Sequence, residues 1–169
     1  MSADTDSDEN SEEDSDDVCP CERESHSDLG PIADDERIAR IVRSIHLNKK
    51  GALKINLFSE KDLTQQGGSF NRLNHEDGDS AVARAKKTLE QSNHQYHGLA
   101  ISTAENVRKL HIDDKRAACV VDSEIKDMPP YDDNPFHGDI WGVDGLPAED
   151  IEQLRNELLA LFSVEILRD

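Results

Sequence analysis

The spacing of apolar and polar positions predicts alternating helices and strands after about residue 36. Segment 34–47, DDERIARIVRSIHL, has its apolar residues at helical spacing, which favours a helix, while their β-branched side chains leave a strand open. Segments 53–58 (LKINLF) and 96–102 (YHGLAIS) alternate as half-buried strands do. Segment 115–124, KRAACVVDSE, is apolar on both faces, so we expect a central strand there.

Three further segments carry helix signals. Segment 79–92 is an amphipathic pattern with Asp79 as its expected cap, and segment 102–110 opens with the capping-box pair Ser102 and Glu105. Segment 146–162 begins with Leu-Pro and places one apolar stripe on its surface, formed by Ile151, Leu154, Leu158, Leu161 and Phe162. The pattern as a whole predicts an α+β fold: a small single domain, a short mixed sheet with helices packed on one side, and a C-terminal amphipathic helix.

The charge of the chain is concentrated at its start. The 169 residues carry a net charge of −18, and residues 1–36 alone hold 15 acids and one base. A segment this acidic buries too little apolar surface to offset its ordering entropy. We therefore expect a disordered acidic tail over residues 1–30 and a single α+β domain over residues 31–169. Such a tail solubilises the protein, binds a basic partner or imitates nucleic-acid phosphates.

Cysteine content and hydropathy bear on the compartment. The sequence has no run of 18 apolar residues and no secretory leader, which favours a cytoplasmic protein that does not enter the membrane. Its three cysteines are an odd number, so we expect no disulfide framework and a reducing compartment. Cys19 and Cys21 are separated by one residue, a poor spacing for a zinc site, so we expect no metal and no cofactor. Cys119 is expected to be a small core residue.

Two histidines are candidate catalytic residues. Strand alternation places His97 on the face of Leu99 and Ile101, where a hydrogen-bonded structural role is the simpler interpretation. His137 follows an Asn-Pro turn and precedes Gly138, which indicates a constrained bend that a structural hydrogen bond would explain. The alternative is that both serve as acid and base.

Candidate anion contacts lie in the basic part of the domain. Residues 37–59 contain six bases and no acid, among them Arg40. The Gly-Gly pair before Ser69 predicts a flexible loop or a hairpin. Arg72 follows it with a guanidinium that can hold a carboxylate or phosphate in two hydrogen bonds. Because aromatic residues do not alternate with these bases, direct nucleic-acid binding is not expected.

Two resemblances extend this interpretation. The stretches DDERIARIVR, KKGALKINLF, YHGLAISTAENVRKL and DNPFHGDI resemble a family of small uncharacterised bacterial proteins over roughly residues 34–143. That resemblance implies a bacterial setting near defence or mobile-element genes, and no activity. Residues 96–110 also resemble the His-Gly strand of poly(ADP-ribose) polymerase-type ADP-ribosyltransferases, which implies that His97 and Gly98 would hold an NAD ribose. Leu99 departs from the usual Ser or Thr.

These observations predict a small accessory or regulatory protein that acts through another protein, bound by the acidic tail or the C-terminal helix. The alternative is an enzyme that uses His97 and His137 in ADP-ribosyl transfer from NAD or in phosphoester chemistry. A metal-stabilised module that uses the cysteines is a third class. The oligomeric state is left open.

Overall fold

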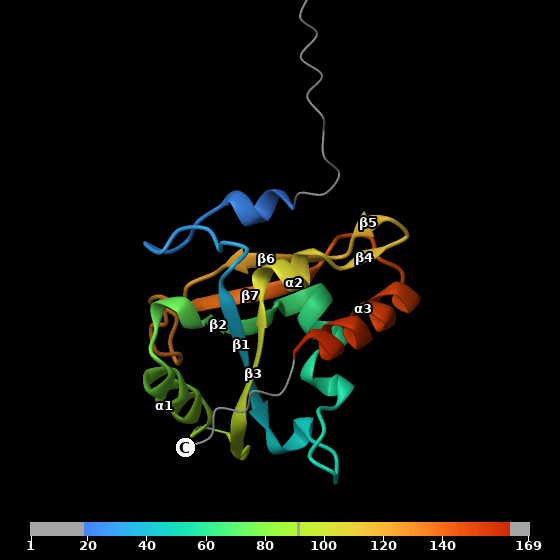
Figure 1. Cartoon of the computed structure of the whole chain (residues 1–169). Helices are drawn as coiled ribbons and strands as arrows, with labels where there is room; N and C mark the ends of the chain where they lie inside the picture. The colour runs from blue at the N-terminus through green and yellow to red at the C-terminus, as the bar shows by residue number, and fades with distance from the viewer. Residues whose placement is uncertain (1–18, 91, 163–169) are drawn as a thin grey trace, which may run out of the picture.

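The computed structural model describes residues 19–90 and 92–162, and it is built around one antiparallel sheet (Figure 1). The five strands stand in the order β3–β1–β2–β7–β6, and every pairing is antiparallel rather than mixed. Their bounds are β1 Arg37–Arg43, β2 Gly68–Arg72, β3 Tyr96–Thr103, β6 Ala118–Asp122 and β7 His137–Gly142. A short hairpin, β4 His111–Ile112 and β5 Lys115–Arg116, precedes β6. The predicted α+β class is confirmed.

Helices cover both faces of the sheet, where the sequence predicts one. α1 (Gly78–Leu89) packs on the face that carries Ala39, Leu99 and Ile101. α2 (Ala104–Arg108) and α3 (Ala148–Leu161) share the core on the opposite face with Ile38 and Ile140. Figure 1 shows α1 and α3 on opposite sides of the strands. A two-faced sheet explains why the central strands carry apolar residues at successive positions.

That burial on both faces explains how segment 34–47 becomes β1 rather than a helix. Ile38 and Val42 enter the core beneath α3, while Ala39 contacts the α1 side, so the apolar positions serve two faces of a strand. Segment 53–58, in contrast, was predicted as a strand and does not form one. Its residues form a 3₁₀ turn, η3 (Ile55–Leu57), that buries Leu57 and Phe58 beside α3.

The stretch around Gly68 forms β2 instead of a loop. It follows the π-helical turn η4 (Asp62–Gln66), and Gly67 has a φ of 83°, which favours glycine. A Cβ on Gly67 would lie 2.7 Å from Asp139 Cγ. The glycine therefore lets β2 begin close against β7.

The C-terminal helix is confirmed, with its apolar stripe facing inward. Ile151, Leu154, Leu158 and Phe162 are buried, and the rings of Phe58 and Phe162 lie 5.0 Å apart. The caps of the other helices differ slightly from prediction, since Asp77 caps α1 and Thr103 caps α2. The apolar stripe of α3 is therefore used within the core of the domain.

Residues 19–36, which we call the strap, pack against the sheet (Figure 1). The strap starts with a single 3₁₀ turn, η1 (Pro20–Arg23), beside β6. Residues 19–30, which lie within the tail predicted over residues 1–30, pack against the folded body in the structure. Residues 1–18 lie outside the described residues. Two other one-turn helices, η2 (Ser44–His46) and η5 (Leu73–His75), complete the connections.

Among the helices of residues 19–90 and 92–162, none combines the length and apolar content that a bilayer crossing requires.

Candidate functional site

A disulfide joins the strap to the edge of the sheet. Cys19, immediately before η1, is bonded to Cys119 on β6, with the two Cα atoms 5.9 Å apart and a sequence separation of 100. The sequence predicted no disulfide framework, and the structure has this one disulfide among its three cysteines. An odd count excludes complete pairing but not one bond, and sequence gives no distance between Cys19 and Cys119.

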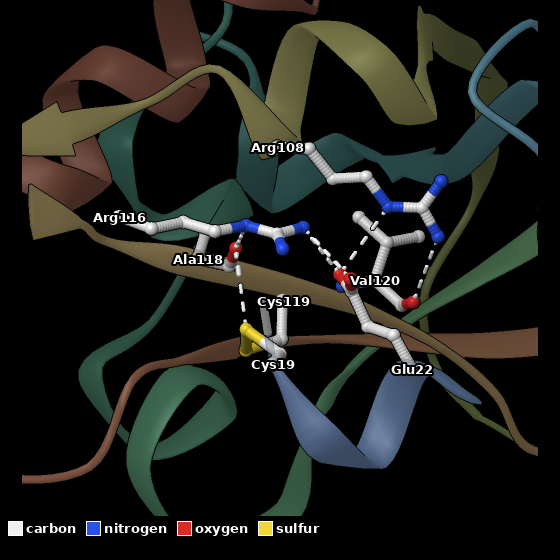
Figure 2. Close-up of a disulfide and its surroundings, with 7 residues drawn as sticks. All are labelled: Cys19, Glu22, Arg108, Arg116, Ala118, Cys119 and Val120. Atoms are coloured by element: carbon white, nitrogen blue, oxygen red, sulfur yellow. Dashed lines mark hydrogen bonds and ion pairs between the residues drawn. A yellow bond between two sulfur atoms is a disulfide. The ribbon is translucent and has the colours of Figure 1, made fainter. Parts of the chain in front are cut away.

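Beside the disulfide, Glu22 anchors η1 to the same strand (Figure 2). Arg116 Nη2 donates to both of its carboxylate oxygens, at 2.6 and 2.9 Å, and the Val120 amide donates to Oε1 at 2.7 Å. Arg108 Nε donates to Oε1 at 3.3 Å. One carboxylate therefore binds two guanidinium groups and a backbone N–H.

These contacts satisfy the outer edge of β6, which has no neighbouring strand on that side among residues 19–90 and 92–162. Hydrogen-bonded residues alternate along an antiparallel pair, and here Ser123 bonds to His137 and Val143 to Ala117. The backbone N–H and C=O groups of Ala118 and Val120, at the positions in between, therefore point away from β7. Glu22 accepts from the Val120 amide, Arg108 donates to the Val120 carbonyl and Arg116 donates to the Ala118 carbonyl. Charged side chains thus close an edge that would otherwise be open to another strand.

The second half of the strap is held by a buried ionic network. Arg72 donates to both oxygens of Glu36, at 2.8 and 2.9 Å, and to the Gly30 carbonyl at 2.7 Å. Its Nη1 also lies 3.4 Å from Asp122 Oδ1. Asp122 Oδ2 in turn accepts from the backbone amides of His26 and Ser27. Arg72 therefore binds a carboxylate in two hydrogen bonds, as its side chain allows, but the carboxylate belongs to the protein.

A cleft of about 830 Å³ opens beside the disulfide. Four segments surround it: η1, the β4–β5 hairpin, the end of β7 and the start of α3. Its apolar lining includes Trp141, Val143 and Leu146 together with the disulfide, and Trp141 and Val143 pack against Cys19, Cys119 and Val121. A volume of this size lies within the range of ligand-binding pockets.

The charged lining of the cleft is acidic on balance. Asp113, Asp144 and Asp150 line the cleft, against Lys115 and an Arg116 that is paired with Glu22. Burial, followed by the charge of Glu22, raises the pKa of the exposed Cys21 thiol, and Asp144 adds to the rise. Cys21 is therefore a neutral thiol at pH 7 and a poor nucleophile.

Cys19, Glu22 and Cys119 are the one cluster of metal-ligating groups among the described residues, with ligand atoms within 4.8 Å of one another. Their sulfur atoms are bonded to each other, and Glu22 already accepts from two arginines. Metal ligation requires free thiolates. The disulfide-bonded arrangement therefore does not suit a metal ion.

The two candidate histidines are not brought together. His137 begins β7, in register with Asn71, Ala39 and Ile101 across the sheet. His97 lies four residues from Ile101 along β3, beyond a register shift opposite Val42 and Arg43. Three strand spacings of about 4.8 Å and four residues of about 3.3 Å put them on the order of 20 Å apart. They cannot act on one substrate as an acid and base pair.

His137 is held as a structural residue would be. Its Nδ1 lies 2.7 Å from the Ser123 carbonyl, to which it donates, and its Nε2 lies 3.9 Å from Asp139 Oδ1. Ser123 Oγ donates to Asp139 Oδ2 at 2.7 Å. These contacts among Ser123, His137 and Asp139 close the long connection between β6 and β7.

Arg40 and Ser69 also meet, but not around a free anion site. Arg40 Nη1 donates to the Ser69 backbone carbonyl at 3.0 Å, and Nη2 donates to Asp62 Oδ2 at 3.2 Å. The guanidinium further donates to the Leu57 carbonyl and covers the Phe58 ring. Since Arg40 and Arg72 are both buried and engaged, the predicted anion contacts serve the fold.

Another groove, of about 580 Å³, lies between α1 and residues 125–134. Exposed Tyr131 is in its lining, with exposed Met128 nearby in the chain. Glu22 and Trp141 carry no local sequence signal that marks them as site residues. The CPC motif marked the right segment, but only the fold brings it to Cys119 and Trp141.

Comparison of the chain with protein-family models, with curated proteins and with solved structures finds no match.

Proposed function

We propose that this protein is an accessory or regulatory interaction module, and that its cleft beside the disulfide binds a basic segment of a partner protein with one apolar anchor residue. The observation that carries the proposal is the composition of the cleft: its lining combines apolar residues that include Trp141 with acidic residues that outnumber the bases not paired with Glu22.

The apolar lining of the cleft suits an anchor side chain. Trp141 and Val143 are half-buried, so each keeps part of its apolar surface towards the cleft. Aromatic residues in concave, partly desolvated sites contribute most to binding at interfaces. An apolar side chain of a partner would cover the remaining surface of Trp141.

The acidic lining residues favour a partner segment of positive charge. Asp113 and Asp144 are exposed and Asp150 is half-buried, while Arg116 is neutralised by Glu22. The adjoining residues 1–18 add nine acids and no base. Charge of this sign attracts a basic segment and accelerates its association at low salt.

The experiment is a titration of the full chain with synthetic peptides in which Lys and Arg flank one Leu. Matched peptides replace the basic residues by Glu, or the Leu by Ser. Trp141 is the chain's single tryptophan, so a change in its emission reports occupancy of the cleft directly. We expect binding of the basic peptide, and weak or no binding of both matched peptides.

Two double variants locate the site. Asp144→Asn with Asp150→Asn should weaken binding by about threefold to tenfold at low salt, since each exposed charge pair contributes about 0.2–1 kcal/mol. Asp132→Asn with Asp133→Asn, in the groove beside α1, is the matched control and should bind as the parent does. Equal affinity for the Lys and Glu peptides, or loss of binding only in the control variant, would refute the proposal.

A further inference from the structure

We propose that the Cys19–Cys119 bond is a reversible redox-modification site, reduced by a dithiol that reaches it through the cleft. Its reduction releases η1 and opens one wall of the cleft. The effect on the disulfide stands by itself, whereas the effect on partner binding rests on the proposed function.

Access to the bond comes from the cleft. Cys19 and Cys119 are 5 % and 6 % exposed, and both line this cavity of about 830 Å³. A thiolate needs a direct approach to one sulfur atom, and the cavity provides that approach. Val121 and Trp141 pack against the two cysteines and line the same cleft.

The two cysteines differ in how freely they can move. Cys119 is in the middle of β6 and paired with β7, whereas Cys19 precedes a single 3₁₀ turn. A reductant thiolate is therefore placed to attack Cys19 Sγ, which breaks the S–S bond and expels Cys119 as a thiolate that takes up a proton. The second thiol of the reductant then attacks the mixed disulfide and leaves Cys19 as a thiol. The products are two protein thiols and an oxidised dithiol, so two electrons and two protons are transferred.

Reduction removes the covalent part of the attachment of η1. Glu22 still binds Arg108, Arg116 and the Val120 amide, but these contacts are reversible and the turn is only four residues long. Because Cys19, Pro20 and Cys21 form one wall of the cleft, release of η1 changes the cleft as well. The neutral Cys21 thiol takes no part in the exchange.

Trp141 provides the readout, because it lies directly opposite Cys119 in the β6–β7 register. Directly opposed residues have Cβ atoms about 4.5–5.5 Å apart, and disulfides quench indole emission at contact. We would titrate the full chain with mixtures of reduced and oxidised dithiothreitol, recording emission and counting free thiols by alkylation. The account predicts a reversible rise in emission as the count goes from one thiol, Cys21, to three.

Variants separate the possible results. Cys119→Ser should show constant high emission, and Cys21→Ser should keep the parent's transition at the same dithiol ratio. Failure of the parent to regain a one-thiol state on reoxidation, or a transition lost in Cys21→Ser, would overturn the proposal.

The peptide titration, repeated on the reduced chain, tests the consequence for binding. Affinity for the basic peptide should fall by about tenfold. A reversible thiol transition without any peptide binding would reject the proposed function and leave the redox site standing. Equal peptide affinity of the oxidised and the reduced chain would reject the claim that reduction of the disulfide alters the cleft.

Discussion

Several charged side chains with little exposed surface form hydrogen bonds with main-chain groups, in place of the bonds that a neighbouring strand or helix would make. Glu22 accepts from the Val120 amide, Arg40 donates to the Ser69 carbonyl and Arg72 donates to the Gly30 carbonyl. Each also has an oppositely charged partner, as burial of a charge requires. At the residue scale, these side chains are structural connections between loops and the sheet.

Buried His46 makes the stability of the fold depend on pH. Its Nδ1 accepts from the Arg43 amide at 3.1 Å, and burial, followed by the charges of Arg43 and Arg40, lowers the pKa of His46 to about 4. The unfolded chain takes up this proton near pH 6.5, so stability is retained above pH 6.5 and falls between pH 6.5 and 4. Allowing for solvent screening, the loss is about 1–3 kcal/mol.

Urea unfolding at pH 7.0 and pH 5.0 measures that loss. His46→Gln, which does not titrate, should lose less stability between these two pH values than the parent does. If the parent and His46→Gln lose the same amount, the buried neutral histidine is not the source of the pH dependence.

At the scale of elements, the connection between β6 and β7 is closed by short polar contacts. Ile125 and Asn134 form an isolated bridge, and Asn134 Oδ1 accepts from the Phe136 amide. His137 then bonds back to Ser123 at the start of the connection. The Asn-Pro turn and the following histidine thus bring residues 123 and 137 together.

Replacing His137 with alanine should lower the free energy of unfolding by about 1–3 kcal/mol, because the Ser123 carbonyl loses its donor. His137→Asn should recover part of this, since its amide nitrogen can donate from a similar position. Thermal unfolding of the three proteins decides the matter. An unchanged midpoint for His137→Ala would show that the contact does not stabilise the turn.

Local pattern predicted α1, α3 and β3, because each has a regular period and α1 and α3 also have clear end signals. It did not separate helix from strand at residues 37–43, since apolar residues that face both sides of a sheet can imitate helical spacing. The site was less predictable. The prediction of a central strand in segment 115–124 is wrong, because β6 is an edge strand. It is nevertheless buried on both faces, since Cys19 covers it from about 100 residues away.

At the scale of the whole molecule, the strap connects the start of the domain to both β6 and β2. The disulfide closes a loop of about 100 residues, which corresponds to about 4.7 kcal/mol in the chain-entropy treatment. The salt bridges of Glu22 and Glu36 hold the same segment at two other points. The cleft therefore depends on a segment whose acidic composition resembles a tail.

Hydrogen exchange of the Val120 amide in the oxidised full chain tests this account most directly. Val120 N–H points away from β7 and has Glu22 as its acceptor, so its protection reports the position of the strap alone. We predict slow exchange at Val120, comparable with Ile140 inside the sheet, and marked acceleration in Glu22→Ala with Ile140 unchanged. Rapid exchange at Val120 in the parent, with Ile140 protected, would contradict the account, because the edge of β6 would then be open.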